Sequence, residues 1–85
     1  MFFMKLDTLE QVNALVNICT KYKDQTDVDV LYGRYILDGC SALGVTSLVG
    51  KIIKIRLNTE DKVLLTYFFR DLEEIGGYKI EGQDW

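Results

Sequence analysis

The chain contains no histidine, and this absence excludes much chemistry. Histidine is the commonest general base and metal ligand in proteins, and its imidazole is the usual ring that accepts a phosphate. Nucleophilic attack by Ser41, Cys40 or Cys19 would need a base, and only carboxylates and lysines outside any recognisable motif remain. We therefore predict no enzymatic centre, no metal and no cofactor.

Clustered basic residues and long apolar runs are also missing. The net charge is −3, whereas nucleic-acid binding normally uses clusters of Lys and Arg, so nucleic acid is not an expected partner. No run approaches the roughly 18 to 20 apolar residues that span a bilayer. The opening MFFMKLD is too short and too soon charged for a secretory signal. We expect a cytoplasmic protein that binds neither a membrane nor a small-molecule substrate.

Cysteine is scarce, with only Cys19 and Cys40 present. An intracellular chain usually keeps its thiols reduced. Cys19 falls on an apolar helical face, where a free cysteine behaves as a small core residue. We predict that Cys19 is buried, while the redox role of Cys40 stays open.

The hydrophobic pattern predicts seven elements in the order β, α, β, β, α, β, α. They are a strand at 2–6, a helix at 8–22, a hairpin in DVDVLYGRYIL broken at Gly33, a short helix between Gly39 and Gly50, a strand in KIIKIRL, and a helix ending at Ile75. We expect three helices on one face of a four-stranded, mainly antiparallel sheet, an α+β open-faced β-sandwich. Residues 1–76 would form the single domain, followed by a loosely held tail at 77–85 with no partner segment.

Helix starts are marked by polar side chains followed by acids. DTLE places Asp7 three residues before Glu10, as in a capping box. NTED offers Asn58 or Thr59 as the cap of the last helix, with two acids in its first turn. The inward positions would be Leu9, Val12, Leu15, Val16, Cys19 and Tyr22 in the first helix, Ile53, Ile55 and Leu57 in the last strand, and Leu64, Phe68, Leu72 and Ile75 in the last helix.

Two stretches invite a functional interpretation. GCSALG lacks the glycine spacing and the lysine of a phosphate-binding P-loop, so its glycines favour turn chemistry. Ser41, at the start of the short helix, is either an ordinary cap or a regulatory phosphorylation site. Asp27 and Asp29 lie on one side of a predicted strand, where paired acids more often form a solvated face than a divalent-ion site.

The segment from Ser41 to Leu48 resembles the second-helix region of HPr, the phosphocarrier protein of the sugar phosphotransferase system. The family pattern is Ser, two apolar residues, Gly, an apolar residue, any residue, Ser and Leu, and the chain reads SALGVTSL there. Element order and chain length are also similar to HPr over residues 2–75. The resemblance implies that Ser41 matches the family's regulatory serine. It places a docking patch on Ala42, Leu43, Thr46 and Leu48, and Cys40 where the family commonly has a lysine.

The first helix departs from the family. Aligning Val16 and Tyr22 places Thr8 at the position of the phosphocarrier histidine and Glu10 at that of the family's arginine. A phosphothreonine would be a stable ester, and Glu10 would repel a phosphate that an arginine attracts. The resemblance thus implies an HPr-like protein without the ordinary carrier reaction.

Three hypotheses follow from the sequence. The first is a regulatory or decoy binding module that meets phosphotransferase-system proteins, a regulatory kinase or a transcription regulator. The second is a phosphocarrier or phosphoacceptor that uses Thr8, Asp7 or Ser41. The third is an unrelated α+β interaction domain with a similar pattern.

Overall fold

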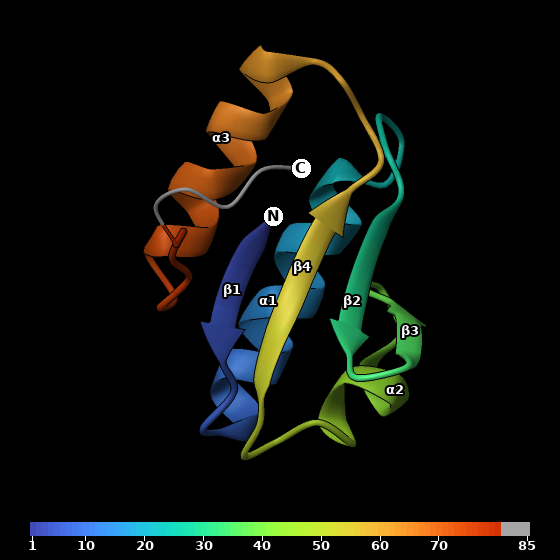
Figure 1. Cartoon of the computed structure of the whole chain (residues 1–85), viewed down its shortest axis with the longest axis vertical. Coiled ribbons are helices and arrows are strands. Elements are labelled where there is room, and N and C mark those ends of the chain that lie inside the picture. Colours follow the sequence, from blue (N-terminus) through green and yellow to red (C-terminus); the bar gives the residue numbers. More distant parts are fainter. Residues whose placement is uncertain (81–85) are drawn as a thin grey trace.

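The computed structural model describes residues 1–80, which form four strands and three helices (Figure 1). In chain order they are β1 (Phe2–Lys5), α1 (Leu9–Tyr22), β2 (Val28–Tyr32), β3 (Tyr35–Asp38), α2 (Ala42–Thr46), β4 (Ile52–Leu57) and α3 (Lys62–Glu73). The predicted order of elements and the α+β class are confirmed. In this part of the chain no helix has the length and apolar character needed to cross a membrane.

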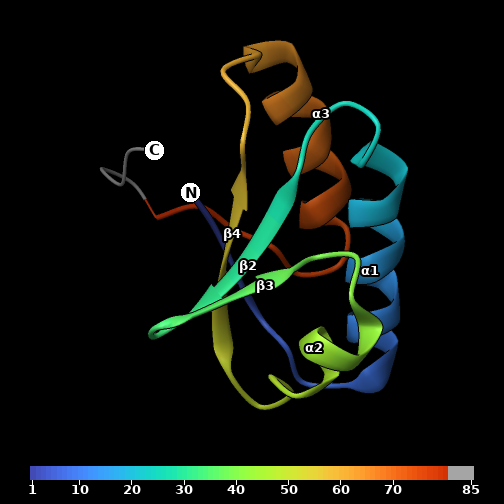
Figure 2. The same ribbon diagram turned by 90° about the vertical axis from the view of Figure 1, so that its right-hand side faces the viewer.

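The strands form one antiparallel sheet in the order β1-β4-β2-β3. Figure 2 shows all three helices on the same side of this sheet, while the other side carries no helix within residues 1–80. This is the two-layer arrangement that the sequence predicts, with one sheet face covered and one open.

Alternation along β4 explains which face is covered. Ile53, Ile55 and Leu57 are buried, and the residues between them point to the opposite face. Ile55 lies between Phe2 of β1 and Val30 of β2, so the three side chains form a buried row across the sheet. Complete burial of such a side chain stabilises the fold by roughly 1.5–3 kcal/mol. The predicted inward face of β4 is confirmed.

The cap of α1 differs from the prediction. Thr8 caps the helix: its hydroxyl oxygen accepts a hydrogen bond from Gln11 N–H (3.2 Å), and Gln11 Oε1 accepts one from Thr8 N–H (3.2 Å). The predicted pairing of Asp7 with Glu10 is wrong by one position, because Gln11 Oε1 also accepts from Asp7 N–H (2.7 Å) and so fixes Asp7 outside the helix. Leu9, expected to face inward, is 61% exposed in the first turn.

α3 also starts later than predicted. Asp61 is its cap, and the Asp61 carboxylate accepts from the backbone N–H groups two and three residues on (2.9 and 3.2 Å). Asn58 cannot serve as the cap, because its side-chain amide donates to the Asp29 carboxylate (2.9 Å) beside the end of β4. Thr59 instead accepts a hydrogen bond from Asp61 N–H (3.1 Å). As a result, the first turn of α3 contains no acid.

The β2–β3 hairpin follows the prediction closely. Tyr32 and Tyr35 are the last paired residues, so Gly33 and Arg34 form a two-residue turn. Gly33 has φ +59° and Arg34 has a negative φ. A positive φ at the first turn position alone is the signature of a type II′ hairpin turn, in which glycine is strongly favoured.

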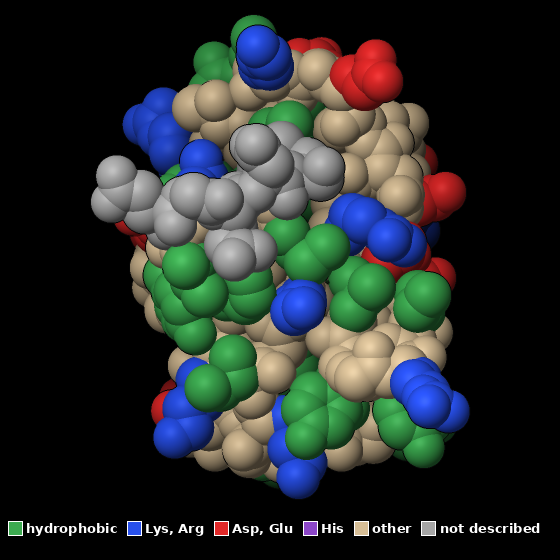
Figure 3. Space-filling model, viewed as in Figure 1, with side chains coloured by type: hydrophobic (Ala, Val, Ile, Leu, Met, Phe, Trp, Pro, Cys, Tyr) green, Lys and Arg blue, Asp and Glu red, His purple; other side chains and the backbone are tan. Residues whose placement is uncertain are grey.

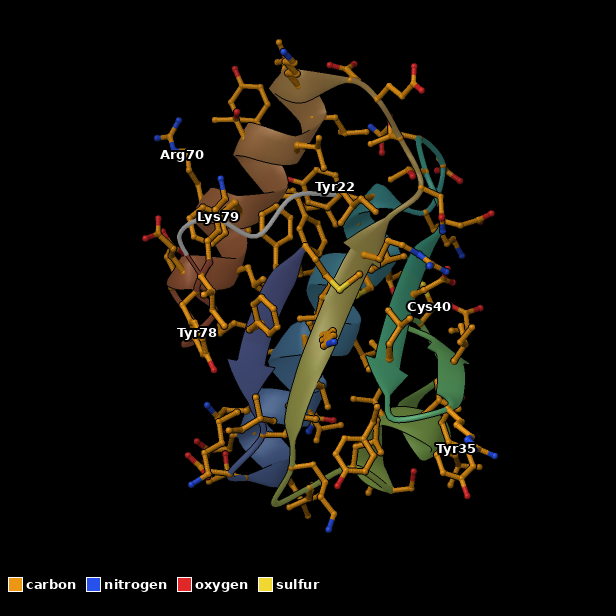
Figure 4. The ribbon with its side chains drawn as sticks, in the orientation of Figure 1. Tyr22, Tyr35, Cys40, Arg70, Tyr78 and Lys79 are labelled. Atoms are coloured by element: carbon orange, nitrogen blue, oxygen red, sulfur yellow. The ribbon has the colours of Figure 1, made fainter. Side chains whose placement is uncertain are left out.

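The tail has a partner that the sequence did not reveal. Tyr78 pairs with Phe3 of β1: each N–H donates to the other's carbonyl at 2.8 Å, and the two rings stack with centroids 5.9 Å apart. Lys79 Nζ lies 4.5 Å from the ring centroid of Phe69. Figure 4 shows Tyr78 and Lys79 beside β1 and α3. The expected absence of a partner segment is therefore wrong at Tyr78, and residues 81–85 of the predicted tail lie outside the described residues.

Candidate functional site

A tight turn at the end of β3 fixes the position of Ser41. The Asp38 carboxylate accepts a hydrogen bond from Cys40 N–H (2.8 Å), and the Asp38 carbonyl accepts one from Ser41 N–H (2.9 Å). Gly39 lies directly against α1, since a Cβ at Gly39 would lie only 2.7 Å from Cys19 Sγ. Glycine thus allows the turn to approach the helix closely, and this approach sets where α2 begins.

Ser41 is the N-cap of α2, as predicted. Its backbone is extended (φ −87°, ψ 100°), and its side-chain oxygen accepts a hydrogen bond from Gly44 N–H (3.3 Å). A Cβ at Gly44 would lie 3.2 Å from Ser41 Oγ, so the glycine leaves the hydroxyl uncrowded. Ser41 itself is exposed to solvent.

The residues around Ser41 form an exposed surface. We call Ser41, Ala42, Leu43 and Thr46 the α2 surface. Leu43 is 89% exposed, the largest exposure among the large hydrophobic residues of the described chain, and Ala42 and Thr46 are exposed as well. Leu48, the fourth predicted docking residue, is only 6% exposed and belongs to the core. A partner could therefore contact the α2 surface but not Leu48.

Thr8 and Glu10 lie at the start of α1, which packs against α2. Figures 1 and 2 place the first turn of α1 and the whole of α2 at the same end of the molecule. Thr8 and Glu10 are exposed, and the Thr8 hydroxyl oxygen is held in the capping box with Gln11. Asp7, beside them, forms a 3.6 Å ion pair with Lys5. The two helix starts therefore share one end of the fold.

Asp29 lies in β2 and its carboxylate is engaged in hydrogen bonds, while Asp27 directly precedes the strand, so the two acids do not stand as a free pair on one strand. Arg56 Nη2 donates to Asp29 Oδ2 at 2.8 Å, and Asn58 donates to the same oxygen at 2.9 Å. Burial alone would raise the pKa of Asp29, but the hydrogen bonds from Asn58 and Arg56 outweigh it and hold this pKa below its ordinary value. Residues 1–80 contain no group of three or more His, Cys, Asp or Glu side chains arranged to hold a metal.

A polar cluster between α1 and α3 escaped the sequence reasoning. Tyr22 donates its hydroxyl hydrogen to Asp71 Oδ2 (2.7 Å), and Lys21 Nζ contacts the same oxygen (3.0 Å). Burial, and then the hydrogen bond to Asp71, raise the pKa of Tyr22 to about 12. Helical spacing marked Tyr22 only as an inward residue, and no local signal links it to a partner 49 positions away. The cluster joins the two helices.

No protein-family model matches the chain, and comparisons with curated proteins and with solved structures give no match.

Proposed function

We propose that this chain is an HPr-like module that binds a partner protein through the α2 surface and does not perform histidine phosphotransfer. The main observation behind this proposal is that Leu43, two residues after the exposed cap Ser41, is itself 89% exposed. An apolar side chain on a rigid helix beside a modifiable hydroxyl suits regulated docking, because apolar contact supplies affinity and an added phosphate changes the charge. The order of elements is also the one that HPr proteins have.

The start of α1 supports the loss of carrier activity. Thr8 stands where the resemblance expects the phosphocarrier histidine, and its oxygen serves as the helix cap. A phosphate on a hydroxyl is an ester, which does not pass on readily as a phosphate on imidazole nitrogen does. Glu10 adds a negative charge in the same turn. A phosphoryl donor therefore meets neither the nucleophile nor the cation that the family reaction uses.

Phosphotransfer is tested with the first enzyme of the phosphotransferase system and phosphoenolpyruvate. We expect no phosphate on this chain by intact-mass spectrometry, whereas an HPr that has the histidine gains one. The double variant Thr8→His with Glu10→Arg restores the two family residues, so it should gain a phosphate. Transfer to the unaltered chain, or stoichiometric phosphate on Asp7 or Thr8 in protein from its own cells, would favour the phosphoacceptor hypothesis instead.

Docking is tested by placing a charge on the α2 surface. Leu43→Glu should weaken binding to the first enzyme or to a regulatory partner, and Ser41→Asp should change that affinity while keeping an N-cap oxygen. Ile36→Glu is the matched control, since Ile36 is also a large exposed residue (61%) but lies on β3. Equal loss of binding in the Leu43 and Ile36 variants would contradict the proposed surface.

A further inference from the structure

A small pocket lies between the β2–β3 hairpin and the turn that follows α2. We call it the hairpin pocket, and it is lined by Tyr32, Tyr35, Leu37, Ser47, Leu48 and Lys51. Its volume is about 240 Å³. Sites for drug-sized ligands usually measure about 300–1,000 Å³, so this pocket suits one large side chain better than a whole small molecule.

The walls of the hairpin pocket are mainly apolar, and the fold leaves them open. Tyr32 and Tyr35 face each other as the last pair of the hairpin, and they are 37% and 68% exposed. The turn at Gly33 and Arg34 holds both strands in register. Figure 4 shows Tyr35 at the hairpin end of the molecule, beside α2. Two exposed tyrosines on a rigid hairpin are typical anchors of a protein interface, because an aromatic ring supplies contact area at little entropic cost.

Lys51 gives the pocket its charge. It is the one charged residue in the lining, and its Nζ lies 5.7 Å from the ring centroid of Tyr32. The structure describes ion pairs for Lys5, Lys21 and Arg56, whereas none is found for Lys51 within residues 1–80. The opposite, open face of the sheet also carries mainly Lys and Arg among hydrophobic side chains at this end of the molecule (Figure 3). An occupant of the pocket therefore gains most if it brings a carboxylate to Lys51.

We propose that the hairpin pocket receives an apolar side chain of a partner protein, with an adjacent carboxylate that pairs with Lys51. This inference rests on the proposed function, because it describes the partner that meets the neighbouring α2 surface. The apolar side chain lies between Tyr32, Tyr35 and Leu48. A second copy of this chain fits less well, since a two-fold interface centred here would bring Lys51 against its own equivalent.

The test is an amide chemical-shift titration of the full chain with three blocked dipeptides. Acetyl-Phe-Glu-amide carries both proposed features, acetyl-Phe-Gln-amide lacks the charge, and acetyl-Ala-Glu-amide lacks the large apolar group. We expect the amide chemical shifts of Tyr35, Ser47 and Lys51 to change. The Phe-Glu peptide should bind about two- to fivefold more tightly than the Phe-Gln peptide, because an exposed ion pair adds only a modest free energy of binding. The Ala-Glu peptide should bind least.

Two lysine variants make the test specific. Lys51→Gln should abolish the preference for Phe-Glu over Phe-Gln. Lys54→Gln, which removes an exposed lysine three residues further on, in β4, should keep it. Tyr35→Ser should weaken both Phe peptides. Shifts that map elsewhere, equal affinity for Phe-Glu and Phe-Gln, the same effect of both lysine variants, or self-association of the free chain would each overturn the proposal. No phosphotransferase protein takes part, so this result is independent of the phosphotransfer test.

Discussion

At the scale of single residues, the thiol of Cys19 lies inside the core, and Cys40 is half-buried at the turn before α2. Burial, followed by the nearby charges of Cys40 and Asp38, raises the pKa of Cys19 to about 12. Cys19 therefore stays in the thiol form at pH 8, whereas the thiolate is the reactive form. We predict that iodoacetamide modifies one thiol of the native protein and two in denaturant.

The control for this prediction is Cys40→Ser, which should leave the native protein almost unmodified. Cys19→Ser should keep the fast modification. Two equally fast thiols in the native protein would show that α1 opens readily at Cys19.

Gly39 lies against α1 and has no room for a side chain. A Cβ there would lie 2.7 Å from Cys19 Sγ and 3.1 Å from the Val28 carbonyl oxygen. Gly39→Ala should lower the free energy of unfolding by about 1–3 kcal/mol, because backbone atoms must shift to accommodate the methyl group. Urea denaturation measures this loss. Adding Cys19→Ala removes one of the two clashes. The loss of unfolding free energy in the double variant should therefore be smaller than the sum of the losses in the two single variants. Losses that add exactly would contradict this account.

At the scale of elements, α1 and α3 are joined by the hydrogen bond from Tyr22 to Asp71. Tyr22→Phe should lower the free energy of unfolding by about 1 kcal/mol at pH 7. The pKa of Tyr22 is raised from its ordinary value of 10.0 to about 12 in the folded chain. Its contribution to stability is therefore complete below pH 10 and is lost as the pH rises from 10 through 12.

Stability measured against pH tests this link. The unaltered protein should lose more stability than the Phe variant between pH 10 and 12. The pKa of Asp71 is held low, first by the hydrogen bond from Tyr22, so its contribution should be present above its ordinary pKa and be lost as the pH falls below that value. Parallel curves for the two proteins in the alkaline range would contradict the role of the hydrogen bond.

The periodicity of apolar residues in the sequence was sufficient to predict which helices and strands form. It did not predict correctly where the helices begin. Ile53 and Ile55 were placed inside correctly, because alternation along a strand is a strong and local signal. The cap of α3 was placed too early, since Asn58 is held by Asp29, 29 positions away in the sequence. Helix caps are decided by such competition between side chains, which a local pattern cannot display.

In the whole molecule, local sequence patterns likewise predict only part of the candidate site. Ser41 could be identified as a cap, because a serine after a turn and before a short apolar stretch is a recognisable start. The exposure of Leu43 and the burial of Leu48 depend on how the five residues of α2 sit against the sheet and α1. The hairpin pocket could not be predicted, because Tyr35 and Lys51 meet only once β3 and β4 share one sheet.

Tyr78 covers the outer edge of β1. β1 is an outer strand of the sheet, and Tyr78 pairs with it on the side away from β4. The Tyr78 ring also stacks on Phe3, which is only 7% exposed. Tyr78→Ala should therefore lower the free energy of unfolding by about 1–2 kcal/mol and uncover Phe3, since stacked aromatic pairs stabilise beyond their buried area. An uncovered edge strand can also pair with another chain.

Denaturation and light scattering measure the two effects of Tyr78→Ala. Tyr35→Ala is the matched control: Tyr35 is 68% exposed, so its loss should cost less stability and leave the β1 edge covered. Self-association should appear in the Tyr78 variant and not in the Tyr35 variant, because Tyr78 pairs with the outer edge of β1 and Tyr35 does not. If both variants were equally stable and monomeric, the backbone hydrogen bonds at residue 78, which alanine retains, would be enough to hold the segment against β1.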